Sequence, residues 1–82
     1  MESVEYGVIS AFAWITDYEY DYLKNNINKN FEELYIDSLD IVEVCIEIEE
    51  KFDLEEIQDN DIKNFKTIKD VIDFVEKHRN RD

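Results

Sequence analysis

The sequence has no proline, one glycine, one cysteine and one histidine, and its 9 basic residues face 22 acidic ones. All-β folds need turn residues at frequent intervals, so the shortage of proline and glycine favours helices. One cysteine cannot form an internal disulfide, and Cys45 with His78 cannot supply the ligands of a zinc site. These absences exclude a domain stabilised by disulfides or by zinc.

Long apolar runs are also lacking. No stretch approaches the roughly 20 apolar residues of a membrane span, and the start MESVEYGV lacks the basic region of a secretory signal. We therefore expect a cytoplasmic protein with one domain, 1–82, in which 76–82 form a frayed basic tail.

The net charge of −13 narrows the choice of partners. A field of this sign repels phosphate backbones and anionic lipid, which argues against binding to nucleic acid or to a membrane. A natural partner would present lysine and arginine. Between residues 32 and 61 there are 13 acids and one base, Lys51, so the charge is concentrated there.

Hydrophobic residues make up 44% of the chain, which is enough for a modest core. Apolar residues at helical spacing predict a first helix over 4–15, capped by Ser3. Residues 16–36 lose this period and predict a long loop. The side chains expected to pin it to the core are Tyr18, Tyr20, Tyr22, Leu23, Ile27, Phe31 and Leu34. A further helix is expected over 38–52, and a short helix or turn over 60–64.

The last helix has a marked start. Thr67 and Asp70 form a Thr-x-x-Asp capping box, and the buried stripe after it comprises Ile68, Val71, Ile72 and Val75. The expected fold is all-α: a small antiparallel four-helix bundle of three main helices and one short helix, with a long loop between helices 1 and 2. So long a loop in so small a domain is often functional.

The expected helix over 38–52 has two apolar stripes. One comprises Ile41, Val44, Cys45, Ile48 and Phe52 and is an ordinary core face. On nearly the opposite side lies a second, called here the outer stripe: Leu39, Val42 and Ile46. An apolar strip rimmed by acids resembles a docking surface; the alternative is that the long loop or the third helix covers it. The acids beside it are Asp40, Glu43, Glu47 and Glu50 on one flank and Glu49 on the other.

Ser38 stands at the start of this helix, where unpaired N–H groups and the helix dipole favour a phosphate. The alternative is that Asp37 or Ser38 is simply the helix cap. As a catalytic nucleophile Ser38 is a poor candidate, because no Gly-x-Ser-x-Gly elbow surrounds it and the histidine is forty positions away.

The residues around Ser38 resemble a known family. The run FEELYIDSLDIVEV over 31–44, the IEEKFD ending of the same helix and the TIKDVIDF of the last helix resemble the acyl carrier protein family. The resemblance covers about 31–76. It implies that Ser38 receives 4′-phosphopantetheine from coenzyme A through a phosphodiester, and that the terminal thiol of this arm carries acyl groups as thioesters.

The resemblance also assigns positions around Ser38. Asp37, Leu39 and Asp40 would flank the attachment point. Two departures are Tyr35, where a glycine is usual, and Gln58, where a proline is usual. Glu47 stands where a small residue is common, which would alter partner choice. The positions implied to dock on basic patches of partner enzymes are Leu39, Val42, Glu43, Ile46, Glu47 and Glu50.

The hypothesis is therefore a monomeric, non-catalytic carrier for fatty-acid or polyketide assembly. Its partners would be a phosphopantetheinyl transferase and acyl-transferring, ligating and condensing enzymes. Alternatives are an aminoacyl or peptidyl carrier, disfavoured because no Gly-Gly precedes Ser38, and an acidic interaction subunit that kept the fold and lost the arm. A third alternative, an enzyme that uses Ser38 and an acid, is disfavoured because the sequence offers no base to activate the serine.

Four further features carry simpler interpretations. The run Asp59-Asn60-Asp61 lacks the glycine and the terminal glutamate of a calcium loop and reads as a solvated cap, so no metal site is expected. Cys45 reads as a small buried hydrophobe. His78 is expected to face water. Trp14 is expected to anchor the core or the loop, or alternatively to line an acyl pocket.

Overall fold

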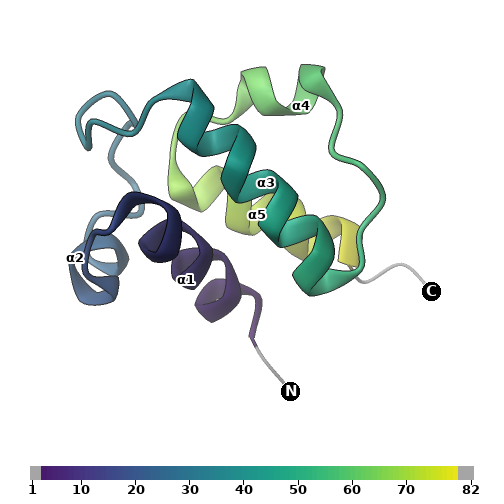
Figure 1. Cartoon of the computed structure of the whole chain (residues 1–82), viewed down its shortest axis with the longest axis horizontal. Coiled ribbons are helices and arrows are strands. Elements are labelled where there is room, and N and C mark those ends of the chain that lie inside the picture. The colour runs from purple at the N-terminus through teal and green to yellow at the C-terminus, as the bar shows by residue number, and fades with distance from the viewer. Residues whose placement is uncertain (1–2, 80–82) are drawn as a thin grey trace.

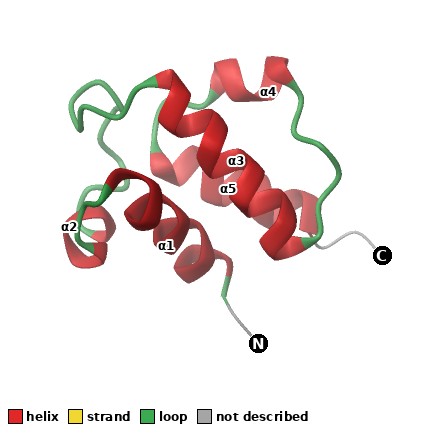
Figure 2. Cartoon of the chain, in the orientation of Figure 1, coloured by secondary structure: helices red, strands yellow, loops and turns green. Residues whose placement is uncertain are grey.

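The computed structural model describes residues 3–79 and consists of helices joined by loops (Figures 1 and 2). Across that range there is no strand, only an isolated antiparallel bridge between Asn30 and Thr67. The all-α class is confirmed. The helices are α1 (Val4–Thr16), α2 (Tyr20–Lys24), α3 (Ser38–Phe52), α4 (Asp59–Asn64) and α5 (Ile68–Arg79).

Helix α1 is the centre of the packing, since it contacts α2, α3 and α5. Figure 1 shows α1 and α3 side by side and running in opposite directions. Ser3 caps α1 as expected, because its hydroxyl oxygen accepts a hydrogen bond of 3.1 Å from the Tyr6 N–H.

The single glycine has a packing role. Gly7 is buried, and a Cβ built on it would collide with Cζ of Phe52 at the end of α3. On the same seam the Lys51 ammonium donates to the Gly7 carbonyl oxygen at 3.2 Å. Glycine at this position therefore lets α1 and α3 approach closely, which the sequence pattern did not reveal.

The long loop predicted over 16–36 is wrong for residues 20–24, which form α2. Leu23 is fully buried against the core and holds this helix to α1. The rings of Tyr6 and Tyr20 lie 5.4 Å apart, and Lys24 pairs with Glu5 at 3.6 Å. Helix α2 is little more than one turn long, too short to show a helical period in the sequence.

The rest of this segment is attached to the start of α5. The Phe31 N–H donates to the Lys66 carbonyl at 2.9 Å, and the Lys69 N–H donates to the Ile27 carbonyl at 2.9 Å. Phe31 also stacks on Phe12 of α1, with ring centroids 5.6 Å apart. The expected loop anchors Leu23, Phe31 and Leu34 are buried; Tyr18, Tyr20 and Ile27 are half-buried; Tyr22 is exposed.

Helix α5 begins as predicted. The Asp70 N–H donates to the Thr67 hydroxyl at 3.1 Å, and the Thr67 N–H donates to the Asp70 carboxylate at 3.2 Å. The expectation of a frayed tail is wrong for 76–79, which continue α5, because the His78 ring stacks on Phe74 with centroids 3.9 Å apart. Residues 80–82 lie outside the described range.

The core confirms the two predicted stripes on α3 and α5 and corrects one side chain. The expected α3 stripe is buried apart from Phe52, which is half-buried, and all four residues of the α5 stripe are buried. Trp14 is 75% exposed, so the prediction of a core or loop anchor is wrong. It follows the buried Phe12 by two residues, or about 200° around α1, and therefore lies off the buried face.

Candidate functional site

The first turn of α3 is capped reciprocally by two carboxylates. The Asp37 side chain accepts from the Asp40 N–H at 2.9 Å, and the Asp37 N–H donates to the Asp40 carboxylate at 3.4 Å. Asp37 is thus the N-cap of α3. Of the two residues that the sequence offered as the cap, Asp37 and Ser38, the structure confirms Asp37. Ser38 is the first residue of the helix, and it is exposed.

The Ser38 side chain is not needed to close the helix. Among residues 3–79, none forms a hydrogen bond with its hydroxyl. The first N–H groups of a helix have no intrahelical acceptor, and here Asp37 takes the one of Asp40. The N–H groups of Ser38 and Leu39 thus remain at the positive end of the α3 dipole, where a phosphate on the serine oxygen is favoured.

A tight turn leads into Ser38. The Ile36 N–H donates to the Phe31 carbonyl at 3.0 Å, and the Tyr35 N–H donates to the Glu32 carbonyl at 3.2 Å. These are the two bonds of a Schellman motif, whose penultimate residue takes the left-handed conformation. Tyr35 holds that position, with φ of 57° and 87% of its surface exposed.

A groove of about 520 Å³ opens beside Ser38. The loop before α3 forms one wall, and the connection from α4 to α5 forms the other. The sequence pattern missed Phe65 and Lys66 of this second wall, because long-range contacts bring that connection here: the bridge between Asn30 and Thr67 and the bond from the Phe31 N–H to the Lys66 carbonyl. The apolar lining is Phe31, Ile36, Ile41 and Phe65, and the polar lining is Asn30, Glu32, Asp37, Ser38 and Lys66.

The outer stripe of α3 faces solvent. Leu39 is 65% exposed, Val42 39% and Ile46 53%. The alternative that the loop or the third helix covers these residues is therefore wrong. Of the acids beside the stripe, Glu43 and Glu50 are exposed, whereas Asp40 and Glu47 are half-buried.

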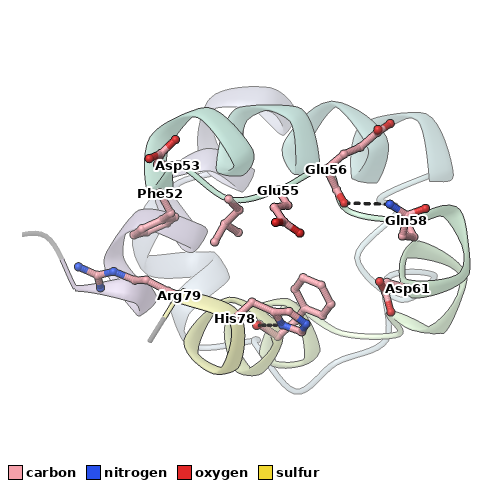
Figure 3. Close-up of a pocket in the computed structure, with 10 residues that line it drawn as sticks. Phe52, Asp53, Glu55, Glu56, Gln58, Asp61, His78 and Arg79 are labelled. Atoms are coloured by element: carbon pink, nitrogen blue, oxygen red, sulfur yellow. Dashed lines mark hydrogen bonds between the residues drawn. The ribbon is translucent and has the colours of Figure 1, made fainter. Parts of the chain in front are cut away.

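A second cavity, of about 420 Å³, lies at the opposite end of α3 (Figure 3). Figure 3 shows Glu55 and His78 extending toward the space between the 53–58 segment and α5. The amide of Gln58 donates to the Glu56 carbonyl at 3.2 Å, and His78 Nδ1 lies 2.9 Å from the Phe74 carbonyl oxygen. His78 is exposed, as expected, although its ring also stacks on Phe74.

Cys45 is buried in the core, which confirms the prediction of a small buried hydrophobic residue. Burial, and secondarily the charge of Glu49, raise the pKa of the Cys45 thiol to about 12. Asp59 and Asp61 lie in the first turn of α4, whose N-cap is Gln58. Within residues 3–79 no three metal-ligating side chains gather in a cluster, and no helix is long and apolar enough to span a membrane.

Comparison with known proteins shows the family to which the chain belongs. The family model for the phosphopantetheine attachment site matches residues 19–75. A protein named acyl carrier protein from Phytoplasma mali (strain AT) is 41% identical over 58 residues, which cover 67% of this chain and 68% of the relative. The chain belongs to the acyl carrier protein family.

Two further relatives with the name acyl carrier protein support the same family. The acyl carrier protein of Helicobacter hepaticus is 44% identical over 48 residues, covering 58% of this chain and 62% of the relative. That of Bdellovibrio bacteriovorus is 50% identical over 46 residues, covering 56% and 58%. The chain thus spans only about three fifths of the length of these two relatives.

Family membership defines the cofactor and its general use. The prosthetic group is a covalently attached 4′-phosphopantetheine, and acyl carrier proteins are carriers that do not themselves catalyse. The first turn of α3 fits such a group, since it offers an exposed hydroxyl, free N–H groups and a helix dipole that favours phosphate.

Proposed function

We propose that Ser38 carries the 4′-phosphopantetheine arm and that the arm holds acyl intermediates as thioesters for fatty-acid or polyketide-type biosynthesis. The observation that carries this proposal is the exposed Ser38 hydroxyl at the start of α3, left free because Asp37 and Asp40 cap the helix.

The other two serines support the choice of Ser38. The Ser3 hydroxyl oxygen is engaged by the Tyr6 N–H as the cap of α1, and Ser10 is half-buried in the middle of α1. Neither lies at an exposed helix start with a free hydroxyl.

The chain supplies the hydroxyl and the phosphate environment, and the transferase supplies the base. The Ser38 oxygen forms a bond to phosphorus as the pyrophosphate bond of coenzyme A breaks, and adenosine bisphosphate leaves. The hydroxyl proton passes to the transferase, because the neighbouring carboxylates of Asp37 and Asp40 are engaged in capping and His78 lies in the last turn of α5. The N–H groups at the start of α3 would hold the phosphodiester through their partial positive charge.

The outer stripe is the surface on which partner enzymes would dock. Its three apolar side chains offer a dry centre, and the acids beside it would attract a basic patch on the partner. The partners proposed are the transferase and the acyl-transferring, ligating and condensing enzymes. The docking residues are Leu39, Val42, Glu43, Ile46, Glu47 and Glu50.

Incubation with coenzyme A and a phosphopantetheinyl transferase tests the attachment point. Wild type and Ser10→Ala are expected to gain the mass of one phosphopantetheine, whereas Ser38→Ala gains nothing. The Ser38→Ala variant should keep its fold, because Asp37 and not Ser38 caps α3. If wild type stays unmodified by several transferases and Ser38→Ala supports growth of the host, the chain acts instead as an unmodified interaction subunit.

A further inference from the structure

Among the described residues, 3–79, three that are not glycine adopt the left-handed conformation: Asp17, Tyr35 and Asp53. Asp17 and Asp53 are the C-caps of α1 and α3, and aspartate is one of the residue types that tolerate positive φ. Tyr35 is different, because a bulky side chain at φ of 57° is a conformational outlier. The position would suit glycine, which adopts it without a steric cost.

The Tyr35 side chain does not offset this cost within the chain. Its surface is 87% exposed, and among residues 3–79 its ring joins no aromatic pair and its hydroxyl no hydrogen bond. Strained residues persist where they serve a site, and an exposed tyrosine is among the side chains that dominate binding interfaces.

Tyr35 is also held firmly near Ser38. The two residues are three positions apart, so their Cα atoms lie within about 11 Å of each other. The Schellman bonds fix the turn, and the Tyr18 hydroxyl donates to the Leu34 carbonyl at 2.8 Å. A partner that binds the ring therefore has little backbone disorder to overcome.

We propose that Tyr35 is an aromatic anchor for the enzyme that attaches the arm to Ser38, and that its ring enters an apolar pocket bordered by lysine or arginine on that enzyme. This inference rests on Ser38 being the attachment point. Such an enzyme must bring its active site to the serine oxygen and so contacts the adjoining turn, whereas enzymes that act on the thioester work at the far end of the arm. The basic border matches the exposed carboxylates of Glu32, Glu33 and Asp37.

Steady-state kinetics of arm attachment test the anchor. For Tyr35→Gly and Tyr35→Asn, KM for the protein substrate should rise roughly tenfold, the loss typical of an interface anchor, with kcat unchanged. Tyr35→Phe keeps the ring and should keep its KM within about twofold. Asp53→Gly, the same relief of a left-handed residue at the far end of α3, should leave KM unchanged.

Thermal unfolding of the same variants separates binding from folding. Tyr35→Gly and Tyr35→Asn should melt no lower than wild type, because both residues tolerate positive φ. An unchanged KM in these two variants, or a KM raised equally in Tyr35→Phe, would overturn the anchor while leaving Ser38 as the attachment point. If wild type accepts no arm at all, the attachment proposal and the anchor fall together.

Discussion

Asp37 and Asp40 cap the start of α3 reciprocally, with the Asp37 side chain 2.9 Å from the Asp40 nitrogen and the Asp40 side chain 3.4 Å from the Asp37 nitrogen. Because these two side chains cap the helix, the hydroxyl of Ser38 is not needed for capping and stays exposed to solvent. The cap of α3 and the hydroxyl proposed as the attachment point thus belong to different residues, so mutation can separate their contributions.

The first prediction is that Asp37→Ala lowers the free energy of unfolding by about 1 kcal/mol, because an N-cap is lost. Ser38→Ala should change it by less than about 0.5 kcal/mol, since an exposed first-turn residue makes no capping bond here. Urea unfolding of the two variants measures both values. Equal destabilisation by the two substitutions would show that Ser38 shares the capping role.

The second prediction concerns Gly7. Alanine is the better helix former by about 1 kcal/mol, yet Gly7→Ala should destabilise the protein by about 1–3 kcal/mol because its Cβ collides with the Phe52 ring. Adding Phe52→Leu should recover part of this loss. Chemical denaturation of the single and double variants checks the coupling, and a Gly7→Ala protein more stable than wild type would contradict the close approach of α1 and α3.

The third prediction concerns docking. Glu43→Lys and Glu50→Lys should together weaken binding to a basic partner enzyme by roughly ten- to a hundredfold, with steeper effects at low salt because exposed charges are screened by ions. Glu19→Lys with Glu76→Lys makes the same change in net charge at two exposed sites outside α3. Binding titrations at several ionic strengths should show the loss in the α3 variant alone; equal losses would indicate only a net-charge effect.

The fourth prediction concerns Cys45, whose pKa is raised from 9.0 to about 12 by burial and by Glu49. At about pH 8 the folded protein should resist thiol-alkylating reagents, and denatured protein should react readily. Above pH 9 the unfolded chain loses this proton while the folded chain keeps it, so stability should fall as pH rises from 9 towards 12. Rapid labelling of the native protein would show that the thiol is accessible.

The long periodic helices were predictable from sequence because their stripes repeat over several turns. The ranges 38–52 and 60–64 agree with α3 and α4 to within one residue, and the Thr67–Asp70 box marks the start of α5. For α3 and α5, local capping chemistry and helical period indicate the same structure.

The sequence-based predictions were wrong where tertiary contacts decide the local structure or the burial of a side chain. Helix α2 is too short to show a helical period in the sequence and depends on the burial of Leu23. Trp14 has a large apolar side chain like that of a core residue, but it faces away from the buried side of α1. The left-handed conformation of Tyr35 belongs to a turn closed by the bonds from Tyr35 to Glu32 and from Ile36 to Phe31. A tyrosine in the sequence gives no signal for this conformation.

For the site, the sequence predicted Ser38 at the helix start and an apolar stripe opposite the core. It could not distinguish Asp37 from Ser38 as the cap, nor exclude that other elements cover the stripe, because both depend on where neighbouring segments lie. The second wall of the groove, with Phe65 and Lys66, comes from a segment nearly thirty residues further along the chain.

The most direct measurement of the central claim is fragmentation mass spectrometry of the protein purified from cells of its native host. The result expected is one phosphopantetheine, with or without an acyl group, on the peptide that contains Ser38. A chain that carries no such group, or that carries it on another residue, would contradict the assignment of Ser38 as the attachment point.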